Sequence, residues 1–120
     1  MARIIIIDDD AVLRETLLTL LTEAGHSAVA ATNGFEGLQL LRAAPADLIL
    51  TDLQMPYGGL PTIRVLRTEF PKVGIIAMSG AGKLRLDIAG TLGANRTLAK
   101  PFSAEELAAA IAEVLGKPSA

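Results

Sequence analysis

Short apolar runs alternate along the chain with longer stretches of helical periodicity. Five of these runs are brief and mostly aliphatic, and they predict β-strands at Arg3–Ile7, Ser27–Ala31, Asp47–Thr51, Val73–Met78 and Arg96–Ala99. The first, third and fourth runs are almost entirely apolar, which is typical of central strands covered by helices on both faces. The repeated strand-helix order therefore predicts an α/β fold around a parallel sheet.

Helical signals lie between and after these runs. Apolar residues from Val12 to Ala24 recur at steps of three and four, and Gly25 follows them as a helix stop. The pairs Asn33–Glu36 and Ser103–Glu106 have the spacing of capping boxes, and they open the second and fifth helices. We expect the last helix to run from Ser103 to about Leu115.

The third and fourth helices are predicted only weakly. Gly58-Gly59 and Pro61 delay the third helix, and Gly80, Gly82 and Gly90 leave the fourth with little intrinsic helical preference. Glycine content alone leaves two alternatives open for the fourth: a mobile segment, or a poorly formed surface helix.

Composition narrows the class of protein. The chain has 120 residues, so we expect one domain over 1–120 and no output domain. Its 11 basic and 13 acidic residues give a net charge of −2, and no basic field favours nucleic acid or an anionic membrane. There is no cysteine, and the apolar run after Arg3 is too short for a signal peptide or a membrane span. We expect a soluble, cytoplasmic protein that binds proteins or small anions.

Polar side chains of different kinds follow four of the predicted strands. Asp8–Asp10 follow the first strand, Asp52 the third, Ser79 the fourth and Lys100 the fifth. Ligands of open parallel sheets bind outside the carboxyl ends of the strands, where these four groups of residues would meet. Carboxylates, a hydroxyl and an ammonium at one edge predict a site for phosphate and a metal ion.

The adjacent carboxylates indicate a divalent cation. Like charges raise one another's pKa unless a cation is present. Mg²⁺ prefers one or two carboxylates together with waters and phosphate oxygens, and Asp8, Asp9 and Asp52 could supply such a site. Asp10 has a simpler alternative, because one carboxylate is enough to cap the first helix.

Asp52 is the candidate nucleophile. A carboxylate beside a metal can attack phosphorus and form an acyl phosphate. A hydroxyl at Ser79 and an ammonium at Lys100 would then stabilise the charge on the transferring phosphoryl group. Taken alone, Asp52 fits equally well at the start of a turn before Pro56, and only its placement with Ser79 and Lys100 favours the chemical role.

Together, in this order and spacing, these motifs resemble the receiver domain of two-component response regulators. The resemblance covers essentially the whole chain and implies a flavodoxin-like doubly wound sheet of five parallel strands, in the order 2-1-3-4-5, with five helices on both faces. The motifs that carry it are Ile7-Asp8-Asp9-Asp10, Asp52-Leu53-Gln54-Met55-Pro56, Ser79-Gly80, Gly93-Ala94 and Lys100-Pro101-Phe102.

The resemblance implies a phosphoacceptor switch. Asp52 would take a phosphoryl group from a histidine kinase or a histidine phosphotransfer protein in a Mg²⁺-dependent reaction. Asp9 and Asp52 would ligate the metal directly, Asp8 through water, and Gln54 through its backbone carbonyl. The protein would be no enzyme beyond self-directed phosphoryl transfer and autodephosphorylation.

The resemblance also implies how the switch works. Ser79 and Lys100 would hold the phosphoryl oxygens, Ser79 would move toward them on activation, and a cis peptide bond would precede Pro101. The signal would leave by protein contacts over residues 83–92, residues 96–98 and the last helix, toward a target that the sequence does not name.

Two positions depart from the family pattern. Thr97 lies three residues before Lys100, where many receivers have an aromatic residue, so an aromatic relay through this position is excluded. The stretch Tyr57-Gly58-Gly59-Leu60 is one residue shorter than usual and lacks Asp-Gly, which predicts a differently shaped loop; Tyr57 either covers the site or lies on that loop. The single histidine, His26, is expected on the surface or in an interface and not as a relay residue.

Two other functions remain as alternatives. Asp8-x-Asp10-x-Val12 also fits the opening motif of haloacid-dehalogenase-like phosphatases, although no acidic pair closes a strand after Lys100 and Asp52 would have no role there. The second alternative is a docking module that works without phosphorylation. Thr97 and the short loop favour it, whereas the complete set of charged site residues counts against it.

Overall fold

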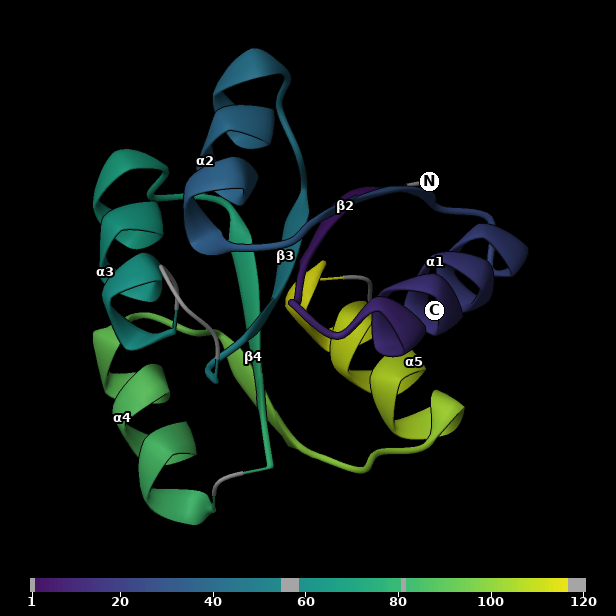
Figure 1. Cartoon of the computed structure of the whole chain (residues 1–120). Coiled ribbons are helices and arrows are strands. Elements are labelled where there is room, and N and C mark those ends of the chain that lie inside the picture. Colours follow the sequence, from purple (N-terminus) through teal and green to yellow (C-terminus); the bar gives the residue numbers. More distant parts are fainter. Residues whose placement is uncertain (1, 55–58, 81, 117–120) are drawn as a thin grey trace.

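The computed structural model describes residues 2–54, 59–80 and 82–116. Strands and helices alternate along the described chain (Figure 1). The elements are β1 (Arg3–Ile7), α1 (Ala11–Glu23), β2 (Ser27–Ala31), α2 (Gly34–Ala43), β3 (Leu48–Asp52), α3 (Leu60–Glu69), β4 (Gly74–Ser79), α4 (Lys83–Leu92), β5 (Arg96–Ala99) and α5 (Ala104–Val114).

The strands form one parallel sheet in the order β2-β1-β3-β4-β5, which confirms the predicted topology. Strands β1, β2 and β5 have the predicted bounds, whereas β3 and β4 each begin and end one residue later. The shift follows from pairing with neighbours: Asp52 is in register with Met78, and Ser79 with Ala99. Two predicted site residues are therefore the last residues of their strands.

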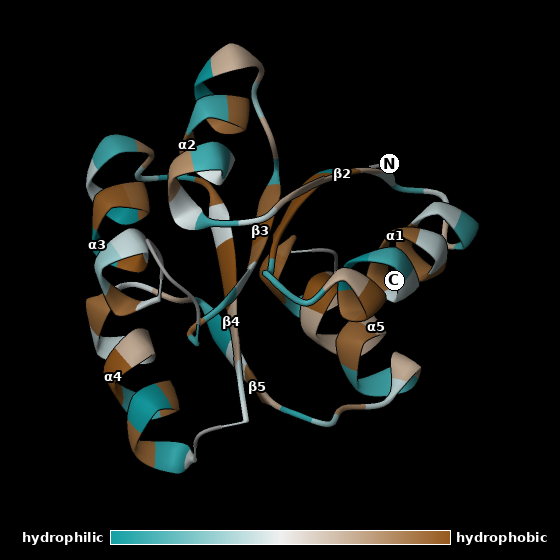
Figure 2. Cartoon of the chain, viewed as in Figure 1, coloured by the Kyte–Doolittle hydropathy of each residue, from teal (hydrophilic) through white to brown (hydrophobic). Residues whose placement is uncertain are grey.

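Two helical layers cover the sheet (Figure 1). Helices α1 and α5 pack on one face against Ile4 and Ile6, while α2, α3 and α4 cover the other face, onto which Ile5 and Ile7 project. All four isoleucines of β1 are fully buried, because successive side chains of a strand point to opposite faces and both faces are covered. Figure 2 shows hydrophobic residues gathered on the strands and on the helix faces that meet them.

Side-chain caps begin three of the helices. The Asp10 carboxylate caps α1 by accepting the N–H groups of Val12 and Leu13. Ser103 and Glu106 form the complete capping box predicted for α5. At α2 the expected box is altered. Asn33 accepts the Glu36 N–H, but the Glu36 side chain accepts from the Thr32 N–H instead of the Asn33 N–H.

The weakly predicted helices are both formed. Helix α3 begins at Leu60 and α4 at Lys83, each directly after a glycine with positive φ, Gly59 or Gly82. Helix α4 is a ten-residue surface helix that buries Leu86 and Ala89. Within the described residues, no helix has the length and apolar character needed to cross a bilayer.

Candidate functional site

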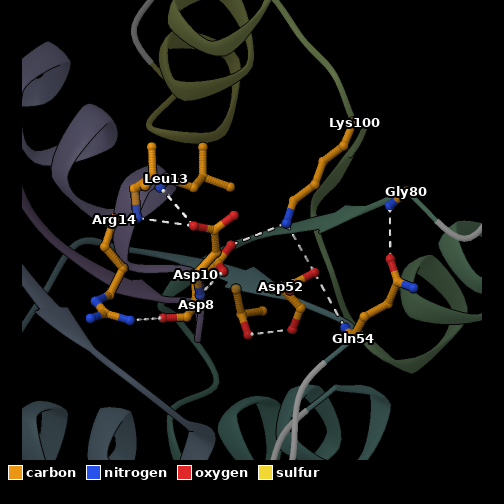
Figure 3. Close-up of polar contacts among 10 residues, drawn as sticks. Asp8, Asp10, Leu13, Arg14, Asp52, Gln54, Gly80 and Lys100 are labelled. Atoms are coloured by element: carbon orange, nitrogen blue, oxygen red, sulfur yellow. Dashed lines mark hydrogen bonds and ion pairs between the residues drawn. The ribbon is translucent and has the colours of Figure 1, made fainter.

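The polar residues at the strand ends meet at the carboxyl edge of the sheet (Figure 3). Asp8 directly follows β1, Asp52 and Ser79 are the last residues of β3 and β4, and Lys100 directly follows β5. The residues Asp8, Asp52 and Ser79 are 0%, 4% and 1% exposed, respectively. Parallel pairing of neighbouring strands therefore brings three buried polar residues and the partly exposed Lys100 to one place, as predicted from the sequence.

Lys100 links two of these carboxylates. Its ammonium nitrogen Nζ lies 3.1 Å from Oδ2 of Asp8 and 3.3 Å from Oδ1 of Asp52. Its backbone N–H donates to the Ser79 carbonyl at 2.9 Å, which fixes the start of the side chain beside the end of β4. One positive charge therefore lies beside two buried negative charges, so this part of the site has excess negative charge.

Burial dominates the electrostatics of Asp52. Loss of hydration is the largest influence and raises the pKa of this carboxyl above its ordinary value. The ammonium of Lys100 and the Gln54 N–H lower the pKa, and the nearby charge of Asp8 raises it. The net upward shift in pKa means that the environment disfavours the charged form of Asp52, and a cation bound beside it would offset this effect.

The carboxylates fit a hard divalent cation. Asp8, Asp9 and Asp52 each offer an oxygen, and these three atoms lie within 4.8 Å of one another. Asp9 is exposed, so the cluster opens toward solvent on one side. Oxygen donors and an open side suit Mg²⁺, which keeps several waters when it binds to proteins. The predicted role of the Gln54 carbonyl stays a prediction.

Asp8 is held by its backbone as well as by its side chain. Its Oδ1 atom accepts the Asp10 N–H at 2.8 Å, and its carbonyl accepts from Nη1 of Arg14 at 2.9 Å. The Asp10 carboxylate caps α1, which agrees with the alternative prediction that Asp10 is a helix cap and not a metal ligand. Arg14 is a supporting residue that the sequence did not reveal, because an arginine on the first turn of a surface helix has no distinguishing pattern.

Gln54 has a second supporting contact that the sequence did not reveal. Its backbone N–H donates to Oδ1 of Asp52 at 3.2 Å, while its side-chain oxygen Oε1 accepts the Gly80 N–H at 3.1 Å (Figure 3). The sequence drew attention only to the backbone carbonyl of this residue. The side-chain contact joins the segment after β3 to the segment after β4.

The remaining predictions concern positions around the site. The cis peptide bond between Lys100 and Pro101 is confirmed. Thr97 is half-buried on β5, in register with Ala77. His26 directly precedes β2 and so lies at the opposite edge of the sheet, where its Nδ1 accepts the Ala2 N–H at 3.3 Å. The shortened loop and Tyr57 fall on residues 55–58, outside the described residues.

Known proteins share both sequence and fold with this chain. The probable chemotaxis protein CheY of Rhizobium etli is 33% identical over 119 residues, which cover 95% of this chain and 92% of that protein. The response regulator MprA of Mycobacterium sp. (strain KMS) is 34% identical over 98% of this chain but only 52% of its own length. The chain thus spans about half the length of this and several similar relatives.

Solved structures give the same result. The crystal structure of a response regulator receiver domain protein from Clostridium thermocellum has a TM-score of 0.90 and 28% identity, over 98% of this chain and 96% of that one. A chemotaxis protein of Vibrio cholerae has a TM-score of 0.89 and 25% identity, over 95% and 98%. The family model described as the response regulator receiver domain matches residues 4–112. A chain matched over that range, and along nearly the whole of a CheY relative, belongs to the response regulator receiver domain family.

Proposed function

We propose that this chain is a phosphoacceptor switch of a two-component pathway and that Asp52 carries the phosphoryl group. The observation that supports this most directly is the Lys100 ammonium, which contacts the buried carboxylates of both Asp8 and Asp52 while Asp9 lies beside them. A structural ion pair would need one buried carboxylate, and the extra negative charge is costly without a further cation. Such an arrangement is typical of a site prepared for a metal and a phosphoryl group.

The chemical step is a phosphoryl transfer to a carboxylate. An oxygen of Asp52 attacks phosphorus and forms an O–P bond, while the P–N bond of a phosphohistidine donor breaks. The electron pair of that bond stays on the imidazole nitrogen, which then takes up a proton. Lys100 and the Ser79 hydroxyl would each contact a phosphoryl oxygen, so that charge is stabilised at the end of β4 and after β5.

Asp8, Asp9, Asp52 and the backbone carbonyl of Gln54 would hold Mg²⁺. When bound, the ion neutralises charge on the phosphoryl oxygens. The chain's own contribution is to hold Asp8 through the N–H of Asp10 and the guanidinium of Arg14. These contacts keep the carboxylate oriented toward the site.

The partners would be proteins. The phosphoryl donor would be a histidine kinase or a histidine phosphotransfer protein, and the signal would leave through α4, β5 and α5. Support for an outgoing contact surface comes from α4, where Leu84 is 74% and Ile88 38% exposed. Residues 1–120 would act as one receiver unit, with no enzymatic turnover on other substrates; its own phosphoryl transfer and autodephosphorylation are the only reactions expected.

Chemical phosphorylation tests the proposal. The purified protein is incubated with acetyl phosphate and Mg²⁺, and the modified residue is mapped by mass spectrometry. We expect one labile phosphoryl group on Asp52, complete loss of label in Asp52→Asn, and normal labelling in the control Asp87→Asn, which removes an exposed carboxylate on α4.

The alternatives predict other results. Label on Asp8, or multiple turnover of phosphate esters, would support a haloacid-dehalogenase-like phosphatase, for which membership of the receiver family gives no support. A protein that takes up no phosphoryl group under these conditions would be a docking module.

A further inference from the structure

Helix α2 packs against the end of β1 through a glycine. The buried residues of α2 are Gly34, Gly37 and Leu41. A Cβ atom built on Gly37 would lie 2.4 Å from Cδ1 and 2.7 Å from Cγ1 of Ile7, and 3.9 Å from Cβ of Ala31. The first two distances are too short for any real Cβ contact. Only glycine therefore fits at residue 37 while Ile7 keeps its place.

Ile7 determines where Asp8 lies. It is the last residue of β1, is 0% exposed and is in register with Ala31 on one side and Thr51 on the other. Its β-branched side chain has restricted rotation about χ1, so it cannot readily turn away from α2. The next residue is Asp8, whose N–H donates to the Ala31 carbonyl at 3.1 Å. A shift of Ile7 would therefore carry Asp8 with it.

The amino end of α2 is held close to the end of β2. Oδ1 of Asn33 accepts the Glu36 N–H at 2.9 Å, and Oε1 of Glu36 accepts the Thr32 N–H at 2.8 Å. The Gly37 N–H donates to the Asn33 carbonyl at 3.0 Å. Moving α2 away from β1 at this point would strain these three hydrogen bonds. A larger residue at position 37 is therefore expected to displace Ile7 and not the helix.

Such a displacement matters because a metal site tolerates little movement. Lengthening the 2.4 Å contact to the ordinary range above 3.4 Å requires about 1 Å. Ligating groups need to be held within about 0.5 Å of their productive positions. Mg²⁺ also demands near-ideal octahedral geometry. Asp8 supplies one oxygen of the three-carboxylate cluster, so even part of this movement would disturb the cluster.

We infer that Gly37 is a positioning residue for the metal site: the lack of a side chain there lets Ile7 hold Asp8 within the three-carboxylate cluster. This inference rests on the proposed function, in which that cluster binds Mg²⁺. Gly37 acts through Ile7 and not by contact with the metal. A residue on the helix after β2 thus sets the geometry of a site formed after β1 and at the end of β3.

The test uses one disrupting variant, one rescue and one matched control. Gly37→Ala adds the Cβ that meets Ile7. Ile7→Val removes Cδ1, the nearest atom, and the double variant Ile7→Val/Gly37→Ala is compared with Ile7→Val alone. Gly90→Ala makes the same change in α4, where a Cβ would have no neighbour within 4 Å. Both glycine substitutions gain the same helix propensity, so they differ in the contact with Ile7.

The measurements are NMR spectra without metal and an NMR titration with Mg²⁺. Without metal, we expect the Asp8 and Asp9 amide resonances to shift in Gly37→Ala and to stay in place in Gly90→Ala. In the titration, the Kd for Mg²⁺ should rise about tenfold in Gly37→Ala, as for other residues that support metal ligands. It should stay close to wild type in Gly90→Ala. The double variant should bind Mg²⁺ with nearly the affinity of Ile7→Val.

Failure of the inference and failure of the proposed function give different results. Wild-type protein that binds Mg²⁺, together with an unchanged Kd in Gly37→Ala or a double variant as weak as Gly37→Ala, overturns the inference alone. A Gly37→Ala protein that does not fold also overturns it, because the contact would then serve the whole fold and not the site. Wild-type protein that binds no Mg²⁺ overturns the proposed function and the inference with it.

Discussion

Two cationic side chains lie at opposite edges of the same sheet, and their surroundings differ in kind. Arg67, on α3, donates all five N–H groups of its guanidinium to neutral acceptors near the amino ends of β4 and β5. These acceptors are the carbonyls of Gly93, Pro71 and Val73 and the Oδ1 atom of Asn95, at 2.8 to 3.1 Å. Lys100, at the carboxyl edge, instead contacts two buried carboxylates.

The comparison separates a structural centre from a chemical one. At Arg67 every donor has a partner and each acceptor is neutral, so the centre needs no further ligand. Partial burial without a carboxylate lowers the pKa of the Arg67 guanidinium, but the group stays charged because its ordinary value is so high. At Lys100 the carboxylates outnumber the cation, and either a further cation or a proton on a carboxylate would relieve the imbalance. Hydrogen bonds alone therefore do not distinguish the two centres, whereas the charge balance does.

The largest expected effect tests the structural centre. In Arg67→Met, the backbone carbonyls that bind the guanidinium lose their donors, and we expect the free energy of unfolding to fall by about 3 kcal/mol. Urea unfolding would measure it. Arg64→Met changes an exposed arginine on the same helix and should cost less than about 0.5 kcal/mol. Similar losses in the two variants would mean that the Arg67 hydrogen bonds contribute little to stability.

A smaller effect compares a glycine at each edge. Gly93 has φ +131°, and a Cβ atom there would lie 2.9 Å from Cγ of Arg67, so Gly93→Ala should cost about 2 kcal/mol. Gly80, beside the Lys100 centre, has room for a Cβ, and Gly80→Ala should change stability by less than about 0.5 kcal/mol. Thermal or urea unfolding of both variants checks the difference. A tolerated alanine at residue 93 would contradict the close packing of Arg67.

The smallest expected effect has the opposite sign. Asp8→Asn leaves Lys100 with one carboxylate partner, so without metal we expect a gain of about 1 kcal/mol in the free energy of unfolding. The same variant should lose the stabilisation that Mg²⁺ gives the wild-type protein. Urea unfolding with a chelator and with Mg²⁺ measures both.

Asp10→Asn is the control, because asparagine caps a helix as well as aspartate does. Mg²⁺ should raise the free energy of unfolding of Asp10→Asn as much as it does for the wild-type protein. A lower free energy of unfolding for Asp8→Asn in the presence of chelator would contradict this prediction. It would mean that the Asp8 carboxylate stabilises the fold even without a metal ion.

Most of the sheet and the meeting of Asp8, Asp52 and Lys100 could be predicted from the sequence. Apolar runs mark the strands, and parallel pairing brings their carboxyl ends to one edge regardless of side-chain detail. The ends of β3 and β4 could not be placed, because pairing with neighbouring strands carries them onto the polar residues Asp52 and Ser79.

The Arg67 centre was missed for a different reason. The hydrogen bonds from Arg67 to Gly93 and Asn95 join residues 26 and 28 positions apart, and periodic patterns in a sequence do not predict contacts at such separations. The hydrogen bond from the Gly80 N–H to the Gln54 side chain also joins residues 26 positions apart, and it depends on the conformation of one side chain. The roles of the site residues in phosphoryl transfer remain predictions, because they concern reactivity and not placement.

The buried β1 strand has a consequence for the chain before it folds. Ile4–Ile7, fully buried in the native protein, form an aliphatic β-branched run of the kind that aggregates when it is exposed. Arg3 precedes the run and Asp8–Asp10 follow it, so charged residues flank the run on both sides. Charged flanking residues of this kind oppose intermolecular strand pairing. Asp8 and Asp9, which would hold the metal in the folded protein, would therefore also oppose aggregation of this segment in the nascent chain.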